Sequence, residues 1–205
     1  MMPIAGLLIA YLAGSIPFAY LAGKLFKGID LREHGSGNLG ATNVFRVMGW
    51  KIASVVMILD MAKGALPVLL LPARFAPESP VLWAIAFGIA AIVGHVKSVF
   101  LLWKGGGKGV ATAGGVFLAL APIPSLISLG VWGIVLYLSG YVSLASLSSA
   151  VALTIAVVIM MGVTSPVAIT SALITAFVFW THRANIGRLR RGEEHRFRRG
   201  AKAAS

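Results

Sequence analysis

The chain has 205 residues, of which 58% are hydrophobic and only 12% are charged. A soluble domain carries about 25% charged residues, so this composition predicts an integral membrane protein rather than a globule in water. The absence of cysteine excludes disulfides, thiolate nucleophiles and cysteine-ligated metals. The net charge of +12 accompanies long apolar segments, which favours anionic lipid or phosphorylated substrates over nucleic acid as partners.

Seven apolar segments approach the length of about 20 residues that a membrane-spanning helix needs. They are residues 3–23, 52–72, 81–103, 110–121, 125–139, 141–161 and 166–181. Pro17 lacks a backbone donor and predicts a kink in the first segment, which we expect to be a retained helix because no basic residue precedes it. The fourth and fifth segments are short and separated by residues 122–124, so they are two steep or partly embedded helices, or one re-entrant pair. We expect a single all-α membrane domain over residues 1–205 with seven spans, and six as the alternative.

Lysine and arginine between the spans predict the orientation, because cytoplasmic loops carry an excess of them. Residues 24–51 hold five, the turn after the third span holds Lys104 and Lys108, and the last 23 residues hold eight. These regions fall on one side of a seven-span arrangement, and the turns on the other side hold only Arg74. We therefore expect the N-terminus outside and the C-terminus in the cytoplasm. From about residue 190 we expect a basic, mobile tail at the membrane surface.

A first polar cluster lies between the first two spans, over residues 35–46. Its small residues let the backbone fold tightly, so that consecutive amides can converge on an anion. Arg46 adds a planar fork that matches phosphate. The neutral polar side chains of the cluster are Ser36, Asn38, Thr42 and Asn43. A tight turn that caps the second helix is the alternative, but it does not explain four polar side chains followed by Arg46, so we favour phosphate or carboxylate binding.

A second cluster precedes the fourth span and consists of Lys104, Gly105, Gly106, Gly107, Lys108 and Gly109. Its composition suits a phosphate cradle at the start of a helix, where backbone amides and the helix dipole favour an anion. It is not a Walker A loop, because position 102 is leucine and Lys108 is followed by Gly109, so ATP hydrolysis is disfavoured. A flexible basic turn would explain the lysines but not three consecutive glycines.

A third cluster follows the last span. His182, Asn185 and Arg188 recur every three residues, so they can share a helical face, with Arg183 beside them. A histidine near a helix end is more often a cap or surface residue than a catalyst. Because Arg183 and Asn185 lie beside it, His182 is also a candidate phosphate ligand or acid–base group, and we weigh the two interpretations equally. Ser143, at the start of the sixth span, is ambiguous because serines in membrane helices usually bond to their own backbone.

Asp60 and Lys63 lie one turn apart inside the second span. Burying either charge alone is costly, so both should face the protein interior, where we favour a structural ion pair over a catalytic role. The six acidic residues of the chain are scattered, so we expect no metal site.

Together these clusters resemble the bacterial acyl-phosphate-dependent glycerol-3-phosphate acyltransferases, the PlsY family. The likeness extends over nearly the whole chain, in the order and spacing of the family. The matching segments are residues 14–18, 35–43 with Arg46, 59–60 with 63–64, 94–95, 104–112, and 182–186 with 188–189 and Gly192. Three glycines follow Lys104 where the family loop has two, and the sequence leaves open which amides of this loop would hold phosphate.

The resemblance implies a seven-helix enzyme of the bacterial inner membrane with its active site at the cytoplasmic face. It implies transfer of a fatty acyl group from acyl phosphate to the 1-hydroxyl of glycerol 3-phosphate, giving lysophosphatidic acid and inorganic phosphate in the first step of phospholipid synthesis. No cofactor is implied, because acyl phosphate is a mixed anhydride with a good leaving group. Proximity and charge stabilisation could then supply most of the rate in a direct transfer.

Within that hypothesis, the glycerol 3-phosphate would be positioned by Lys104, Arg46, Ser143, His182 and Asn185. The loop over residues 36–43 and the glycine-rich turn would hold the acyl-phosphate headgroup, with the acyl chain between helices. His182 is the candidate proton acceptor, and the phosphate of the substrate is the alternative. The sequence leaves open whether the basic tail binds the enzyme that forms acyl phosphate. A carrier of phosphorylated metabolites is a weaker alternative function, because no internal repeat is visible and the polar clusters lie at one face.

Overall fold

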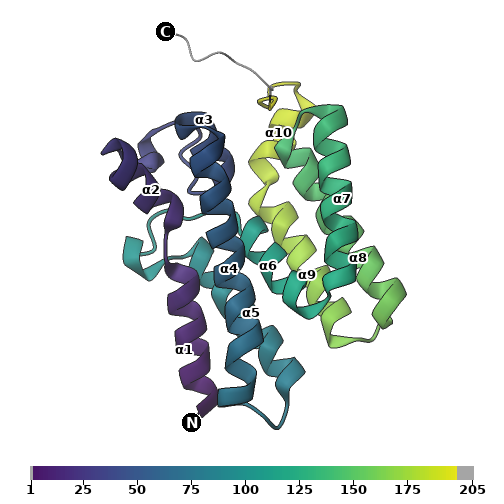
Figure 1. Ribbon diagram of the computed structural model, residues 1–205. Helices are drawn as coiled ribbons and strands as arrows, with labels where there is room; N and C mark the ends of the chain where they lie inside the picture. The colour runs from purple at the N-terminus through teal and green to yellow at the C-terminus, as the bar shows by residue number, and fades with distance from the viewer. Residues whose placement is uncertain (1, 198–205) are drawn as a thin grey trace. The chain divides into compact units, whose positions relative to one another are not determined.

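The computed structural model describes residues 2–197. Over this range the chain forms ten α-helices and two short 3-10 helices, without a strand. It divides into two compact units, unit 1 (Met1–Pro122) and unit 2 (Ile123–Ser205). The prediction of an all-helical chain is therefore confirmed for the described residues (Figure 1).

Unit 1 is built around the long helix α4, which packs against α1, α3, α5 and α6, while α1 also packs along α5. Its elements are α1 (Met2–Ser15), α2 (Phe18–Lys27), η1 (Leu31–Glu33), α3 (Ala41–Met48), α4 (Trp50–Phe75), α5 (Pro80–Val96), η2 (Val99–Leu101) and α6 (Val110–Leu120). Within this unit, α2 and α3 lie at the end opposite the N-terminus (Figure 1). Buried apolar residues of α2, η1, α3 and α4 form a small core at that end, which supports the loops of the first polar cluster.

Glycines allow α1 and α5 to cross at close range. A Cβ built on Gly14 would overlap the backbone of Ala91, and one built on Gly94 would overlap the backbone of Tyr11. Small residues permit such close backbone contact between membrane helices, where van der Waals packing replaces the hydrophobic effect. The crossing fixes the C-terminal end of α5, against which the glycine-rich turn packs.

Unit 2 contains α7 (Pro122–Ser139), which begins at the unit boundary, α8 (Val142–Met161), α9 (Pro166–Thr181) and α10 (Arg183–Arg190). Hydroxyl groups join its helices. The Thr154 and Thr175 Oγ1 atoms lie 2.9 Å apart between α8 and α9, and Ser128 Oγ of α7 donates to the Ser149 carbonyl at 2.7 Å. Such bonds between helices are favourable in lipid, where water does not compete for the polar atoms.

Five helical segments of the described chain are long and apolar enough to cross a membrane. They are Met2–Lys27, Trp50–Phe75, Pro80–Leu101, Pro122–Ser139 and Val142–Met161. Pro166–Thr181 with Arg183–Arg190, a pair bent by 60°, is the sixth candidate. The predicted span 110–121 is the short helix α6, whose 11 residues rise only about 16 Å against a hydrocarbon core of about 30 Å.

Prolines divide the helices differently from the prediction. The expected kink at Pro17 is a break, because α1 ends at Ser15 and α2 begins at Phe18. The segment 122–124 was expected to separate the fourth and fifth spans, and this is wrong. The helices are separated at Ala121, and Pro122 and Pro124 both lie in the first turn of α7. A missing N–H at this position costs no helical hydrogen bond.

The predicted basic tail lies partly outside the described residues, which end at residue 197. Its first part returns to the turn between α7 and α8. The Phe197 amide donates to the Gly140 carbonyl at 2.6 Å, and Arg196 Nε donates to the Tyr141 hydroxyl at 3.0 Å.

Candidate functional site

The first polar cluster is a loop that leads into α3 and is fastened by a buried amide. The Asn43 side chain is 1% exposed, and its Oδ1 accepts a hydrogen bond from the Ser36 amide at 2.8 Å. Its Nδ2 donates to the carbonyls of His34 and Leu31 at 2.9 and 3.3 Å. Asn43 was predicted as a substrate ligand, and the structure shows its amide holding the loop that carries Ser36.

The other predicted residues of this cluster lie nearer the surface. Ser36 and Arg46 are exposed, and Asn38 and Thr42 are half-buried. Thr42 lies in the first turn of α3, where backbone amides lack helical partners, and Arg46 lies in its last turn. The sequence predicted a loop over all of residues 35–46 and missed this helix. Its N-terminal turn adds amide donors of the kind that bind anions.

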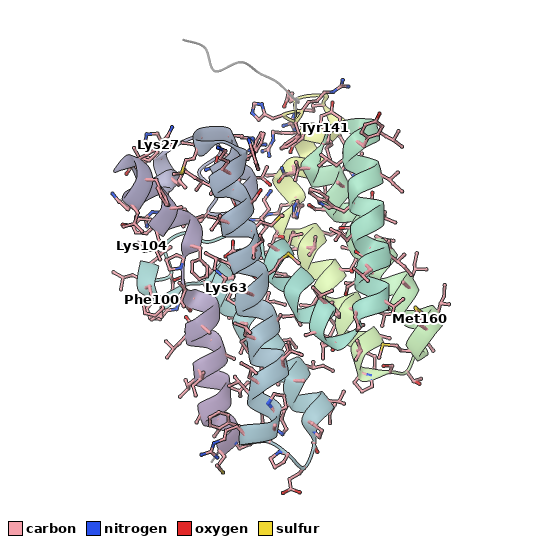
Figure 2. The ribbon with its side chains drawn as sticks, in the orientation of Figure 1. Lys27, Lys63, Phe100, Lys104, Tyr141 and Met160 are labelled. Atoms are coloured by element: carbon pink, nitrogen blue, oxygen red, sulfur yellow. The ribbon has the colours of Figure 1, made fainter. Side chains whose placement is uncertain are left out.

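The glycine-rich turn, Lys104 to Gly109, lies between η2 and α6, and the Lys104 side chain is exposed (Figure 2). Leu102 and Trp103 precede it with φ of 51° and 58°, a conformation that non-glycine residues adopt at a cost of about 1–3 kcal/mol. The Trp103 amide offsets part of that cost by donating to the Ser98 carbonyl at 2.9 Å. Gly109, with φ of 82°, caps α6 without a side chain. The turn therefore begins and ends with backbone conformations that are specific to this segment.

The turn and the first cluster are neighbours within unit 1. The Gly107 amide donates to the His95 carbonyl at 3.4 Å, and a Cβ built on Gly107 would overlap the His95 ring and lie 3.0 Å from the Leu39 carbonyl oxygen. Arg32 Nη1 donates to the Lys104 carbonyl at 3.0 Å. The structure thus brings together two clusters that are separated by some 60 residues of sequence.

In unit 2, a carboxylate that the sequence did not single out gathers three of the predicted residues. Glu194 Oε1 accepts hydrogen bonds from Ser143 Oγ at 2.9 Å and from Asn185 Nδ2 at 2.6 Å. Its Oε2 accepts from Arg188 Nε at 2.7 Å. Burial alone would raise the pKa of Glu194, but the hydrogen bonds from these partners outweigh it and hold the pKa below its ordinary value.

His182 lies at the bend between α9 and α10 and is 4% exposed. Its Nδ1 is 2.8 Å from the Val178 carbonyl oxygen. A carbonyl only accepts, so this contact assigns the proton to Nδ1 and makes Nε2 the basic nitrogen of the neutral ring. Arg183 stacks on Trp180, with its guanidinium carbon 4.8 Å from the ring centroid, and donates to the Trp180 carbonyl at 3.0 Å.

Asp60 and Lys63 form an ion pair inside α4, with Lys63 Nζ 2.7 Å from Asp60 Oδ1 and both side chains almost fully buried. Lys63 also donates to the Ile16 carbonyl at 2.8 Å, at the break between α1 and α2. His95 Nδ1 lies 3.6 Å from Asp60 Oδ1. The pair therefore joins the broken first segment to α4 and α5 in the interior of unit 1, where Figure 2 labels Lys63.

These observations define a class. Over its described residues the chain is all-helical, with five helices of membrane-spanning length, or six spans if the bent pair α9 and α10 is one, and it carries two glycine- and cation-rich loops suited to phosphate. The chain belongs to the glycerol-3-phosphate acyltransferase family, whose sequence model matches residues 4–192. The proteins of that name from Solidesulfovibrio magneticus and Geobacillus kaustophilus are 47% and 46% identical to it. The alignments cover 98% of both chains in the first case, and 89% of this chain and 90% of the relative in the second.

Solved structures of PlsY (YgiH), an integral membrane glycerol 3-phosphate acyltransferase, share the fold. The glycerol 3-phosphate form is 39% identical, with a TM-score of 0.88 over 97% of this chain and 96% of the other. The lysophosphatidic acid form is 39% identical, with a TM-score of 0.83 over 96% and 95%. The resemblance predicted from the three clusters is therefore confirmed. The protein is a multi-pass membrane acyltransferase of phospholipid synthesis.

Proposed function

We propose that the protein transfers a fatty acyl group from acyl phosphate to the 1-hydroxyl of glycerol 3-phosphate. An ester bond forms between the hydroxyl oxygen and the carbonyl carbon, the bond from that carbon to the phosphate oxygen breaks, and lysophosphatidic acid and inorganic phosphate leave. The observation that supports glycerol 3-phosphate as the acyl acceptor is family membership, since a relative has been solved in glycerol 3-phosphate and lysophosphatidic acid forms.

The choice of acyl phosphate as the donor is supported by chemistry. Phosphate is a good leaving group, so no covalent nucleophile is needed in a chain that lacks cysteine. The thioester-dependent glycerolipid acyltransferases use a histidine followed five residues later by an aspartate. The four histidines of this chain are followed at that distance by Leu39, Phe100, Gly187 and Gly200.

In unit 1, the two neighbouring loops supply the anion-binding groups. Lys104 and Arg46 would bind phosphate oxygens as full charges. Amides of the turn and of the first turn of α3 would donate neutral hydrogen bonds, which stabilise charge that develops on the carbonyl and on the leaving phosphate. The other proposed ligands of this unit are Ser36, Asn38, Thr42, Gly105, Gly106, Gly107 and Lys108, while Asn43 would hold the loop that carries Ser36.

In unit 2, His182 would accept the hydroxyl proton through Nε2, consistent with the proton that Val178 assigns to Nδ1. Ser143 and Asn185 would contact glycerol 3-phosphate, with Arg188 and Arg183 adding positive charge. Glu194 would hold Ser143, Asn185 and Arg188 in place.

For topology, we propose seven membrane segments in one domain of the bacterial inner membrane, the fourth being the short, partly embedded helix α6, with the N-terminus outside and the active-site loops in the cytoplasm. The distribution of lysine and arginine supports this orientation. Because the chain has no cysteine, single substitutions report accessibility without background. A membrane-impermeant thiol reagent should label Ser79→Cys in intact cells and label Lys27→Cys only after lysis, and the opposite pattern would reverse the orientation.

The proposed reaction is tested with purified protein in detergent, glycerol 3-phosphate and palmitoyl phosphate. Phosphate and lysophosphatidic acid should appear in equal amounts, and both should fall steeply in Lys104→Ala. Phosphate release without lysophosphatidic acid would mean hydrolysis of the donor and would contradict the proposal.

A further inference from the structure

Arg32 connects the two loops of unit 1, although no sequence motif singled it out. It lies in η1 (Leu31–Glu33), and its Nη1 donates to the Lys104 carbonyl at 3.0 Å. A Cβ built on Gly105 would lie 2.9 Å from Arg32 Cδ, and one built on Gly37 would lie 2.9 Å from the Arg32 carbonyl oxygen. Its side chain thus supports the glycine-rich turn, while its main chain supports the first polar loop.

The guanidinium is itself held from two sides. Nε donates to both carboxylate oxygens of Asp30 at 3.0 and 3.1 Å, and Nη2 donates to Oδ2 at 2.6 Å. Its central carbon lies 5.3 Å from the centroid of the Tyr20 ring, within the range of a cation–π contact. The hydrogen bonds from Arg32 lower the pKa of Asp30 to about 2, because they favour the charged form of the carboxylate. These contacts aim Nη1 at Lys104.

Fixing one carbonyl also fixes the next amide. In a trans peptide the C=O and the following N–H point in opposite directions. When Arg32 binds the Lys104 carbonyl, it therefore turns the Gly105 N–H away from Arg32 and keeps that carbonyl from turning toward an anion. A carbonyl facing the phosphate would repel it, whereas an amide attracts it.

We propose that Arg32 is a positioning residue for glycerol 3-phosphate, acting through the Lys104–Gly105 peptide and held by Asp30 and Tyr20. The inference rests on the proposed role of Lys104 in binding this substrate, because the Arg32 hydrogen bond holds the main chain from which the Lys104 side chain extends. Lysine cannot replace the arginine, because a single ammonium lacks the planar fork that binds the Asp30 carboxylate and the Lys104 carbonyl together.

The test compares Arg32→Lys with the matched control Arg74→Lys. Arg74 is also in unit 1 and also lies against an aromatic ring, 5.9 Å from the Phe75 centroid, but it is in the last turn of α4. Loss of one charge-assisted hydrogen bond should raise KM for glycerol 3-phosphate about tenfold in Arg32→Lys, with kcat changed far less. Arg74→Lys should leave both constants unchanged.

Hydrogen exchange supplies a readout that does not depend on catalysis. Amides of residues 104–107 should exchange faster in Arg32→Lys and in Asp30→Asn than in the unmodified enzyme, while those of α4 should not. An Arg32→Lys enzyme with unchanged KM and unchanged exchange would overturn the inference, as would an activity loss that only follows the fraction of folded protein.

Lys104→Ala separates this inference from the proposed function. If Lys104→Ala raises KM for glycerol 3-phosphate and Arg32→Lys does not, only the role of Arg32 is refuted. If Lys104→Ala leaves KM unchanged as well, Lys104 does not bind this substrate and the proposed roles of Lys104 and Arg32 both fall, whereas the reaction itself is refuted only by the absence of lysophosphatidic acid.

Discussion

Substituting Gly106 by alanine tests whether the glycine-rich turn must sit where the structure places it. A Cβ built on Gly106 lies 2.7 Å from the carbonyl carbon of Val96 and 2.9 Å from the carbonyl oxygen of His95, and it overlaps the Val96 oxygen. These are backbone atoms at the end of α5, so they cannot rotate aside. The turn itself has to move.

Relieving this overlap requires the turn to shift by about 1 Å, a misplacement that can cost on the order of 100-fold in rate. Strain of this kind in a packed region also costs about 1–3 kcal/mol of stability. The φ of Gly106 is outside the left-handed range, so the expected effect is steric and not a backbone penalty. We therefore expect Gly106→Ala to lose about 100-fold in kcat/KM while remaining folded.

The matched control is Gly114→Ala on α6, where a Cβ meets nothing within 4 Å. Alanine is favoured over glycine in a helix by up to about 1 kcal/mol, so this variant should keep full activity. Steady-state kinetics in detergent and thermal unfolding of both variants would check the prediction. Wild-type kinetics in Gly106→Ala would refute the placement of the turn against α5.

Three further predictions concern ionisable groups. Asp60→Asn leaves the Lys63 charge buried without its partner and should lower the free energy of unfolding by about 3–5 kcal/mol, which would appear as a lower Tm. The double variant Asp60→Asn with Lys63→Met should recover part of this loss. Additive losses would contradict the pairing. Because hydrogen bonds hold the pKa of Glu194 below its ordinary value, its contribution to stability is complete above the unfolded pKa of about 4.3 and disappears as the pH falls through the folded pKa. Glu194→Gln should therefore flatten the acid side of a plot of Tm against pH, and an unchanged plot would contradict this. If His182 accepts the proton, His182→Ala should lower kcat about 10²–10⁴-fold, whereas a raised KM at unchanged kcat would make the substrate phosphate the acceptor.

The lengths of the apolar segments predicted the helix bounds most accurately. The predicted segment 166–181 has the bounds of α9, and 141–161 differs from α8 by one residue. Breaks between helices were harder to predict from the sequence, because a proline can either interrupt a helix or begin one. Pro17 does the former and Pro122 the latter. Helix α3 was missed because its eight residues lie inside a polar cluster and carry no long apolar run.

Composition located the polar clusters, but it could not assign their internal hydrogen bonds. Asn43 has the same donors and acceptors whether it binds substrate or its own loop, and only coordinates show that it holds the Ser36 amide. Glu194 was expected in a solvated tail, although it lies six residues after Arg188, close enough along the chain to return to it. Arg32 was missed because its contact with Lys104 joins residues 72 positions apart.

The central claim is that acyl phosphate is the donor. Purified enzyme in detergent would receive glycerol 3-phosphate with palmitoyl phosphate, palmitoyl-CoA or palmitoyl carrier protein in parallel, and lysophosphatidic acid would be measured in each. We predict product from palmitoyl phosphate alone, with one phosphate released for each lysophosphatidic acid formed and both lost in Lys104→Ala. Product from either thioester at a comparable rate, with none from palmitoyl phosphate, would contradict the account.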